Sequence, residues 1–267
     1  AAQLIEQELV DGVSLTGSVE AGSQIASLAG RHIKKVVLEL GGSDPFIVLE
    51  DTDIAKTARM ALHARMINSG QSCIAAKRFI VMAAIARPFM EALEREVKEV
   101  KIGNPMESST TIGPLAKQDF VEVLAGQLED AKRKGARVIY GPSPPPGEGF
   151  FFQPAIVSQV EKDMRILTEE VFGPIMPVLV AQGEEDLVQM ANDTPYGLGA
   201  SIWTRDLDRG ERIARTLEAG FVAINDIVKS DPRLPFGGIK KSGIGRELSE
   251  YGLKEFVNIK SVVVKGA

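Results

Sequence analysis

The stretch that decides the fold is DGVSLTGSVEAGSQIASLAGRHIKKVVLELGG, residues 11–42. A short apolar run at 13–15 leads into a Gly-Ser turn and then into an amphipathic helical pattern over 21–32. A second strand, KKVVLEL at 34–40, is predicted to be buried and ends at a double glycine. The order strand, helix, strand predicts one βαβ unit, and such a unit implies a parallel sheet with helices packed on it.

The alternation of strand and helix continues to the C-terminus. Further strands are predicted at 46–49, 77–82, 136–141, 152–160, 176–181, 199–204 and 221–225, and helices at 3–9, 54–67, 88–100, 115–134, 184–192 and 207–218. Asp51 or Thr52 is expected to cap the helix that begins at Ile54. Residues 142–149 are too rich in proline for regular structure, and the segment from Leu234 predicts a Gly-rich loop, a helix and a terminal strand. The fold class is α/β throughout.

Composition narrows the class of protein. With 44% hydrophobic residues, 25% charged residues and a net charge of −5, the chain is typical of a soluble globular protein and unlike a disordered or nucleic-acid-binding one. One cysteine cannot form an intrachain disulfide, and there is no apolar run of about 18 residues that predicts a membrane span. We therefore expect a cytoplasmic protein. Because the chain begins Ala1-Ala2-Gln3 without methionine, we also expect a segment of something longer.

The lone cysteine ends the stretch NSGQSC, residues 68–73. Gly70 lets the backbone turn sharply, and a cysteine at the exit of such a turn can aim its own N–H at an oxyanion. A nucleophile must be a thiolate, and an unperturbed thiol is only slightly ionised at neutral pH. Free cysteine is also among the most buried residue types, so Cys73 on its own fits a core residue as well as a nucleophile.

Glu39 is the second candidate, because it lies inside the apolar stretch VVLELGG, residues 36–42. A carboxylate in a buried strand needs a partner or a chemical role. Burial raises the pKa of a carboxyl group toward neutrality, which suits a general base, although a structural carboxylate paired elsewhere fits the same pattern. The double glycine behind Glu39 allows a close approach by another backbone or by a ligand.

Two other stretches suggest a nucleotide, each weakly on its own, and a third is rich in glycine. TEEVFGP, residues 168–174, places an acidic group beside an aromatic ring, which suits a sugar hydroxyl pair and a planar ring. SLTGS, residues 14–18, has the strand-turn-helix order that can hold a phosphate, but it is no G-x-G-x-x-G fingerprint. The glycine-rich stretch 234–247 predicts a loop that something approaches closely. No metal site is predicted, since the two histidines, His32 and His63, are isolated in the sequence.

Six motifs follow one another along the chain. They are LELGGSDP (38–45), NSGQSC (68–73), IGP (112–114), EEVFGP (169–174), NDTPYGLGASIWT (192–204) and PFGGIKKSGIGRE (235–247). In order and rough spacing they resemble those of the aldehyde dehydrogenase superfamily over essentially the whole chain. The resemblance implies an aldehyde dehydrogenase-like catalytic domain with a parallel sheet and flanking helices, preceded by the last βαβ unit of a Rossmann-like cofactor domain.

The resemblance also implies a chemistry. In that family a cysteine attacks the aldehyde to give a thiohemiacetal, hydride passes to NAD or NADP, and water hydrolyses the thioester. Cys73 would then be the nucleophile and one oxyanion donor through its N–H, and Glu39 would be the base that activates water. The cofactor-binding residues would be Gly17 and Ser18 at the pyrophosphate, Leu40, Glu170 at the nicotinamide ribose, and Phe172 near the nicotinamide.

The family resemblance implies four parts of the chain. They are a remnant of the dinucleotide-binding domain (1–41), the catalytic domain (42–241), a helix returning to the cofactor domain (242–256) and an oligomerisation strand (257–267). Family members are roughly twice this length, so most of the cofactor domain, including a second oxyanion donor, is expected to be missing. The terminal strand favours a homo-oligomer, a dimer or a tetramer, because it has no evident partner in its own sheet.

Among subgroups, the stretch from Lys229 onward is most similar to succinate-semialdehyde dehydrogenases, which act on a small aldehyde with a carboxylate. Such a substrate needs an arginine or a hydroxyl group nearby. The candidates by position are Arg65, Ser230 and Arg233. Two features of some such enzymes are absent, since Ile67 stands where they carry an arginine and Ala75 where they carry a second cysteine.

Alternative functions stay open at this point. The chain can be a truncated, catalytically inactive fragment that oligomerises or binds a partner. It can also be a thiol esterase that uses Cys73 and Glu39 without a cofactor. A coenzyme A-acylating enzyme is disfavoured, because that branch of the family usually lacks a glutamate at the position of Glu39. The choice between NAD and NADP depends on residues outside this sequence.

Overall fold

The computed structural model describes residues 1–141 and 149–266, in which the strands form three sheets, of seven, three and two strands. The helices are α1 (Ala2–Ile5), α2 (Val19–Arg31), α3 (Ile54–Met66), η1 (Ile67–Gly70, a 3-10 helix), α4 (Ala83–Lys98), α5 (Gln118–Arg133), α6 (Arg165–Thr168), α7 (Glu184–Asn192), α8 (Leu207–Ala214) and α9 (Ser249–Glu255). The strands are β1 (Gly12–Thr16), β2 (Lys35–Glu39), β3 (Pro45–Val48), β4 (Arg78–Met82), β5 (Arg137–Tyr140), β6 (Ala155–Ser158), β7 (Ile175–Ala181), β8 (Tyr196–Gly197), β9 (Gly199–Trp203), β10 (Phe221–Ile224), β11 (Ile239–Lys240) and β12 (Gly243–Ile244).

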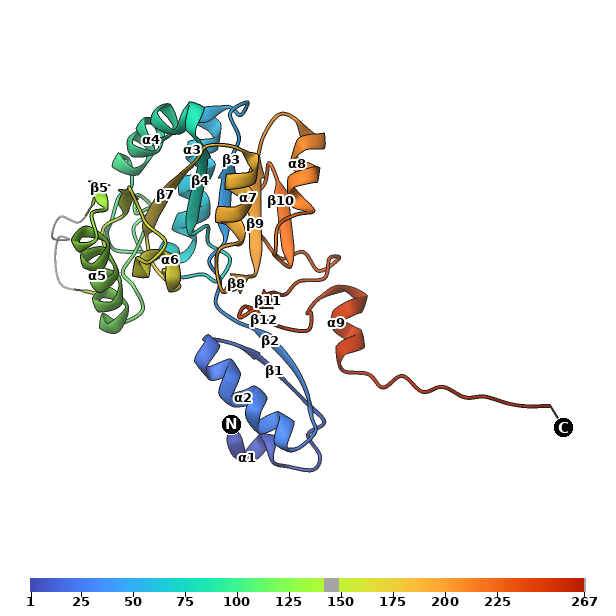
Figure 1. Ribbon diagram of the computed structural model, residues 1–267. Helices are drawn as coiled ribbons and strands as arrows, with labels where there is room; N and C mark the ends of the chain where they lie inside the picture. Colours follow the sequence, from blue (N-terminus) through green and yellow to red (C-terminus); the bar gives the residue numbers. More distant parts are fainter. Residues whose placement is uncertain (142–148, 267) are drawn as a thin grey trace.

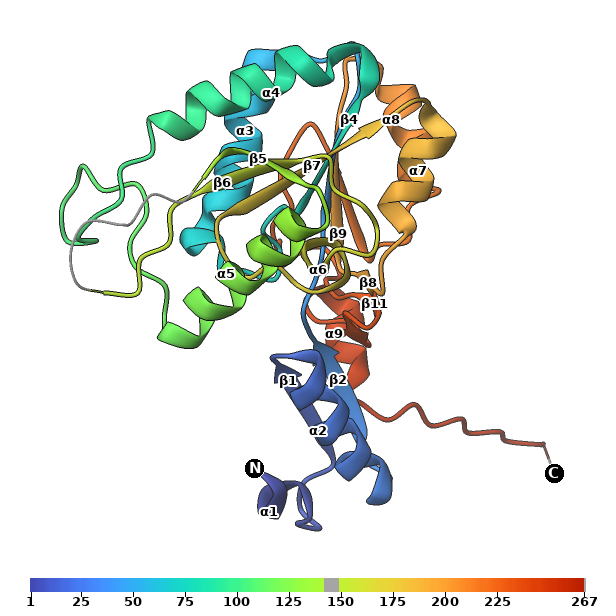
Figure 2. The ribbon, with the colours of Figure 1, turned by 60° about the vertical axis from the view of Figure 1, so that its left-hand side comes forward.

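The small sheet has the order β1-β2-β12 and lies beside the main body, to which β2 leads directly (Figures 1 and 2). β1 and β2 are parallel, with Gly12 opposite Lys35 and Thr16 opposite Glu39, and α2 connects them. β12 arrives from the far end of the chain and pairs antiparallel with β2, which sets Gly243 opposite Glu39. The C-terminal segment is thereby joined to the N-terminal βαβ unit.

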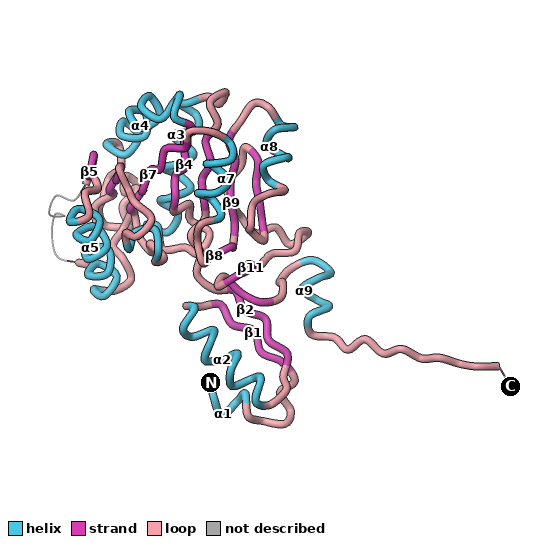
Figure 3. The backbone as a smooth tube through the Cα atoms, viewed as in Figure 1, coloured by secondary structure: helices cyan, strands magenta, loops and turns pink. Residues whose placement is uncertain are grey.

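The large sheet has the order β10-β9-β3-β4-β7-β6-β5. All of its neighbouring strands run parallel except β5, which is antiparallel to β6. Helices α3 and α4 cover one face, and α7 and α8 lie on the other (Figure 3). A sheet covered on both faces needs strands that are apolar throughout, and this explains the continuous apolar runs in the sequence.

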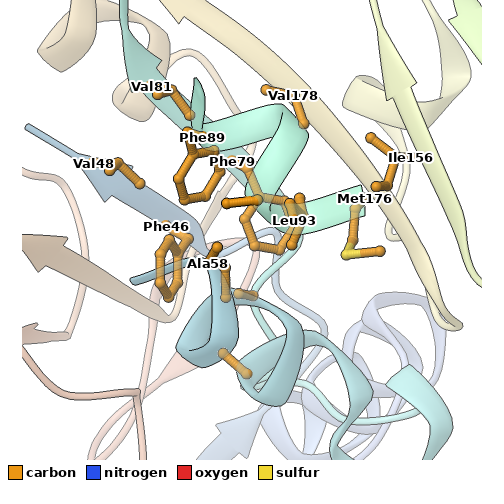
Figure 4. Close-up of a cluster of buried hydrophobic side chains, with 14 of the residues drawn as sticks. Phe46, Val48, Ala58, Phe79, Val81, Phe89, Leu93, Ile156, Met176 and Val178 are labelled. Atoms are coloured by element: carbon orange, nitrogen blue, oxygen red, sulfur yellow. The ribbon is translucent and has the colours of Figure 1, made fainter. Parts of the chain in front are cut away.

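Side chains of β3 alternate between two cores, one on each face of the large sheet. Phe46 and Val48 point to the core under α3 and α4, where they join Phe79 and Leu93 (Figure 4). Ile47 and its neighbour Leu49, just after the strand, belong to the core under α7 and α8. Both cores are fully buried at these positions, and they hold the strand ends in place.

The α/β fold class is confirmed, and the element predictions differ from the structure in a few places. The cap of α3 is Asp53, whose side chain accepts a hydrogen bond from the Lys56 N–H at 3.0 Å; the prediction of Asp51 or Thr52 was wrong. Asp51 instead accepts hydrogen bonds from the segment that precedes α8. Helix α4 begins five residues before Pro88 and includes it, α1 and α8 are shorter than predicted, and α6 was missed because it has only four residues.

The C-terminal segment extends away from the body after α9 (Figure 1). Residues 257–266 are mostly exposed and pair with no strand in the described chain, so the oligomerisation strand stays a prediction. The proline-rich loop predicted at 142–149 falls outside the described residues except for its last glycine. Within the described ranges, no helix has the length and apolarity that a membrane crossing requires.

We predict that replacing Leu93 by alanine lowers the free energy of unfolding by about 2–5 kcal/mol, because Leu93 is fully buried between α4 and the sheet and its removal leaves a cavity. The chain's single tryptophan, Trp203, stacks on Phe46 in the same core and reports unfolding through its fluorescence. Leu9→Ala is the matched control, since Leu9 is 96% exposed and should change the value by less than about 0.5 kcal/mol. Equal effects of the two changes would contradict this packing.

Candidate active site

A cavity of about 520 Å³ lies where the end of β2 meets the main body. It brings together seven residues singled out in the sequence, namely Gly17, Ser18, Glu39, Leu40, Cys73, Glu170 and Phe172. Thr16, Gly41, Gln71, Ser72 and Phe120 complete its lining. Segments as far apart in sequence as β1 and the loop before β7 thus share one space.

A tight backbone turn delivers Cys73 to this cavity. Helix α3 ends at Met66, and Asn68, Ser69 and Gly70 then follow one another in the left-handed region with φ of 50°, 58° and 80°. A Cβ on Gly70 would lie 2.5 Å from the carbonyl carbon of Gly173, so only glycine fits there. The turn therefore packs directly against the loop that carries Glu170 and Phe172.

Cys73 is half-buried, and its backbone N–H has no acceptor among the described residues. An unused N–H beside a nucleophile is the donor that an oxyanion requires. The pKa of the Cys73 thiol is raised to about 12, chiefly by burial and also by the nearby Glu39 carboxylate, whereas Lys77 acts in the opposite direction. At rest the thiol is therefore protonated.

Glu39 is the last residue of β2 and is only 5% exposed. Desolvation raises its pKa from 4.5 to about 7, against the opposing effect of a hydrogen bond with the Cys73 thiol. Its Oε1 atom is buried without a hydrogen-bond partner among the described residues. A carboxyl group that titrates near neutrality and has an unused acceptor atom can take a proton from a water molecule.

The loop after α6 contributes an acidic and an aromatic side chain. The Glu170 carboxylate accepts a hydrogen bond from the Gly42 N–H at 3.2 Å, and the Phe172 ring stands edge-on to Phe120 with 5.6 Å between centroids. Across the cavity, Ser18 caps α2 by accepting from the Ala21 N–H at 3.2 Å. A carboxylate can accept hydrogen bonds from ribose hydroxyl groups, an aromatic ring can lie against a planar ring, and a helix N-terminus can bind phosphate. Together these groups fit the nicotinamide and phosphate part of a dinucleotide.

The three residues predicted to bind a substrate carboxylate fall in other places. The prediction of Arg65 was wrong, because its guanidinium is fully buried and donates to backbone carbonyls of Gly70, Ala76, Val171 and Gly173. Arg65 thus joins the loop of Cys73 to the loop of Phe172. Ser230 and Arg233 are exposed, and the Arg233 guanidinium pairs with Asp231 at 2.6 Å. Two residues near them, Val228 and Phe236, pack in the apolar cluster that Cys73 touches.

Metal ligands do not gather in the described part of the chain. No group of three or more His, Cys, Asp or Glu side chains there is placed to share a metal ion. His32 and His63 are both exposed, at the end of α2 and on α3.

Comparison with known proteins identifies the family. The sequence matches the model of the Aldehyde dehydrogenase family over residues 1–262. The chain belongs to the aldehyde dehydrogenase family. This confirms the resemblance read from the six sequence motifs.

Similar curated proteins are succinate-semialdehyde dehydrogenases by name. A probable succinate-semialdehyde dehydrogenase [NADP(+)] of Synechocystis sp. is 45% identical over 98% of this chain and 58% of the relative. The succinate-semialdehyde dehydrogenase [NADP(+)] of Deinococcus radiodurans is 46% identical over 97% of this chain and 54% of the relative. This aldehyde dehydrogenase family chain therefore spans little more than half the length of the curated relatives it matches.

Solved structures agree with this fold. The structure of Gox0499, described as giving insights into cofactor and substrate selection, superposes with a TM-score of 0.95 at 42% identity and covers 99% of this chain and 58% of that one. A betaine aldehyde dehydrogenase of Staphylococcus aureus in complex with NAD+ superposes with a TM-score of 0.91 at 35% identity, over 96% of this chain and 51% of that one.

Several residues in or behind this cavity were not predicted as site residues from the sequence. Phe120 and Gln71 line the cavity, and Gln71 Oε1 accepts from the Ala116 N–H at 2.8 Å. Lys77 and Asp44 lie behind it, 1% and 2% exposed. Lys77 and Asp44 had a detectable signal, since each is a charged residue at the border of an apolar strand, whereas nothing local marks Phe120.

We predict a pH-dependent difference between the wild-type protein and Glu39→Gln in alkylation of Cys73 by iodoacetamide. Below about pH 6 the two rates should coincide, because Glu39, with a pKa of about 7, is uncharged in both proteins. Above about pH 8 the variant should react roughly three- to tenfold faster, since loss of the Glu39 charge lowers the pKa of the thiol.

Alkylation is measured by intact mass, and Cys73→Ala is the blank because Cys73 is the only cysteine. A slower reaction of Glu39→Gln at high pH would contradict the electrostatic account. It would mean that Glu39 accepts the thiol proton.

Proposed function

We propose that this protein carries out NADP-dependent oxidation of a small aldehyde, with succinate semialdehyde as the preferred substrate, to the carboxylic acid. One observation carries the proposal: the thiol of Cys73 and the carboxyl group of Glu39 line one cavity, where each shifts the pKa of the other. A thiol that forms an acyl intermediate needs a second group to break it, and Glu39 would fill that role.

The first step is attack by the Cys73 thiolate. Its sulfur forms a bond to the aldehyde carbon, and the carbonyl oxygen becomes an oxyanion that the Cys73 N–H can bind. A single donor of this kind contributes on the order of 10²–10³ in rate. Because the thiol has a raised pKa, only a small fraction is thiolate at neutral pH, and the rate of this step rises with pH.

Residues of this chain fit one end of a nicotinamide cofactor. Glu170 would hold ribose hydroxyl groups, Phe172 would lie near the ring, Leu40 would line the same wall, and the α2 N-terminus with Gly17 and Ser18 would face phosphate. When bound, the nicotinamide ring supplies the hydride acceptor that turns the thiohemiacetal into a thioester. NADP is favoured over NAD by the names of the curated relatives.

The last step is hydrolysis of the Cys73 thioester. Glu39 accepts a proton from a water molecule through its unpartnered Oε1 atom while the water oxygen bonds to the acyl carbon. The carbon–sulfur bond then breaks, which releases the acid and restores Cys73. A general base in this position contributes about 10²–10⁴ in rate.

The substrate carboxylate is proposed to meet the loop that carries Ser230 and Arg233. Arg233 is 85% exposed at its side chain and could share its guanidinium between Asp231 and a ligand. The similarity to succinate-semialdehyde dehydrogenases by name supports a substrate with a carboxylate at the far end.

We predict that Glu39→Gln separates the two halves of the reaction. With NADP and succinate semialdehyde, the variant should release about one equivalent of NADPH per Cys73 and then turn over about 10²–10⁴ times more slowly, because only the thioester hydrolysis lacks its base. Rapid-mixing absorbance at 340 nm, roughly the NADPH maximum, measures both phases. Cys73→Ala should show neither phase, and NADPH formation that survives in it would rule out the proposal.

A thiol esterase is the second candidate, because the Cys73 and Glu39 pair is complete within this chain. We predict slow release of p-nitrophenol from p-nitrophenyl acetate without NADP, lost in Cys73→Ala and reduced to a single turnover in Glu39→Gln. Spectrophotometry follows the release. Hydrolysis that does not depend on Cys73 would exclude this activity, while hydrolysis without any NADP reduction would favour it over aldehyde oxidation.

A further inference from the structure

Lys77 is a buried cation directly beside the nucleophile loop, and the chemistry above does not use it. Its side chain is 1% exposed, and it precedes β4 by one residue. The ammonium donates to the carbonyl oxygens of Cys73 at 2.7 Å, Ser72 at 2.9 Å and Ala75 at 3.4 Å. Three carbonyls of a short irregular loop therefore converge on one nitrogen.

The same ammonium also reaches the cofactor side of the cavity. Lys77 Nζ lies 3.4 Å from Glu170 Oε1, the oxygen that accepts the hydrogen bond from the Gly42 N–H. Glu170 is 21% exposed at its side chain, so one partner of the ion pair is open to the cavity and the other is sealed behind it. Charge at Glu170 is thus felt by Cys73 through a single intermediate group.

The backbone holds Lys77 rigidly in this position. The N–H groups of Lys77 and Arg78 both donate to the Asp44 carbonyl, at 2.9 Å and 3.2 Å. The Asp44 carboxylate is buried and accepts from the Gly199 N–H at 3.0 Å. Desolvation lowers the pKa of Lys77, and the neighbouring carboxylates of Glu170 and Asp44 oppose that shift.

The alternative is that Lys77 only donates hydrogen bonds to the backbone carbonyls of the loop and has no effect on the reactivity of Cys73. A buried ammonium is costly unless it is paired, and carbonyls alone would satisfy it. Arg65 shows that arrangement in this protein, since the hydrogen-bond partners of its guanidinium among the described residues are all backbone carbonyls. Lys77 differs because its fourth neighbour is the cavity carboxylate.

We propose that Lys77 is a positioning residue that couples Glu170 to Cys73, so that the state of the cofactor-side carboxylate sets the reactivity of the nucleophile. The proposal rests on the proposed function, in which Cys73 attacks and Glu170 meets the cofactor. Lys77 touches no substrate. It fixes the Cys73 carbonyl, and its charge, partly offset by Glu170, favours the thiolate.

The test is a double-mutant cycle on Cys73 alkylation by iodoacetamide, with no cofactor or aldehyde present. Lys77→Met should slow the reaction about tenfold at a fixed pH between 7 and 9, which corresponds to a rise of about one unit in the pKa of the thiol. Glu170→Gln should speed it about threefold, since the charge of Lys77 is then less offset. In the Lys77→Met background, Glu170→Gln should change the logarithm of the alkylation rate by no more than half as much as it does in the wild-type protein.

Other charged groups face the same thiol and must stay unchanged through the cycle. They are Glu39 from β2 and Asp44 from the segment between β2 and β3. The full pH profile of the rate separates coupling from misfolding, because a disordered loop exposes Cys73 and gives faster alkylation in place of a shifted profile. Lys77→Arg, which keeps the charge, should retain most of the wild-type rate.

Lys240→Met is the matched control. Lys240 also donates to two carbonyls, those of Asn192 and Thr194, and pairs with Glu218, but it does not line the cavity. Its replacement should leave Cys73 reactivity unchanged. If Glu170→Gln changed the alkylation rate equally with and without Lys77, the proposal would be overturned. It would also be overturned if Glu170→Gln had no effect in the protein that keeps Lys77, and this second outcome is measured without any substitution of Lys77.

Failure of this proposal and failure of the proposed function can be told apart. The cycle measures only thiol reactivity, so it can succeed in a protein that oxidises no aldehyde. Normal NADP reduction with additive alkylation effects would refute the coupling alone.

Discussion

The close passage of Gly42 against Cys73 is the constraint on which the site depends. A Cβ on Gly42 would lie 2.9 Å from the Cys73 carbonyl oxygen, closer than real Cβ atoms come. The link from β2 to β3 can therefore press against the nucleophile loop only with glycine there. Because Glu39 ends β2 only three residues before Gly42, that contact also holds the carboxyl group near the thiol.

Buried cations hold the loops of this site together, and they do so through backbone carbonyls. Arg65 joins the segment around Gly70 to the one around Gly173, and Lys77 gathers three carbonyls next to Cys73. Irregular loops leave carbonyls that no helix or strand satisfies, and each would cost free energy if it were buried alone. A guanidinium or an ammonium can satisfy several at once, which lets a loop without regular structure keep a fixed shape.

Local sequence signals predicted much of the fold and part of the site. Periodicity located the strands of the large sheet, since each is an apolar run bounded by turn residues, and the βαβ unit at 11–42 followed from one stretch. Chemistry marked Cys73 and Glu39, because a lone thiol and a carboxyl group in an apolar strand are unusual anywhere. The cavity that joins them to Glu170 is formed by long-range packing, which no local pattern reveals.

Arg65 shows why the remaining part of the site could not be predicted. An arginine eight residues before the nucleophile fits a substrate carboxylate by position, and its sequence neighbours do not say which way it points. The direction is decided by carbonyls of the loop at 171–173, about a hundred residues away in sequence, which compete for the same guanidinium. The sequence therefore shows that an arginine is available near Cys73. Only the packing of the loops decides whether its guanidinium binds a ligand or backbone carbonyls.

The pKa values of Cys73 and Glu39 determine the protonation state of the site at rest. Burial raises the pKa of Cys73 to about 12 and of Glu39 to about 7, so near neutrality the thiol keeps its proton while the carboxyl group is about half ionised. Each negative charge disfavours the other, so a free thiolate beside an ionised Glu39 is the least populated state. Among the principal influences on the pKa of Cys73, only the positive charge of Lys77 lowers it. The reactivity of the nucleophile therefore depends on how much of that charge Glu170 and Asp44 leave available.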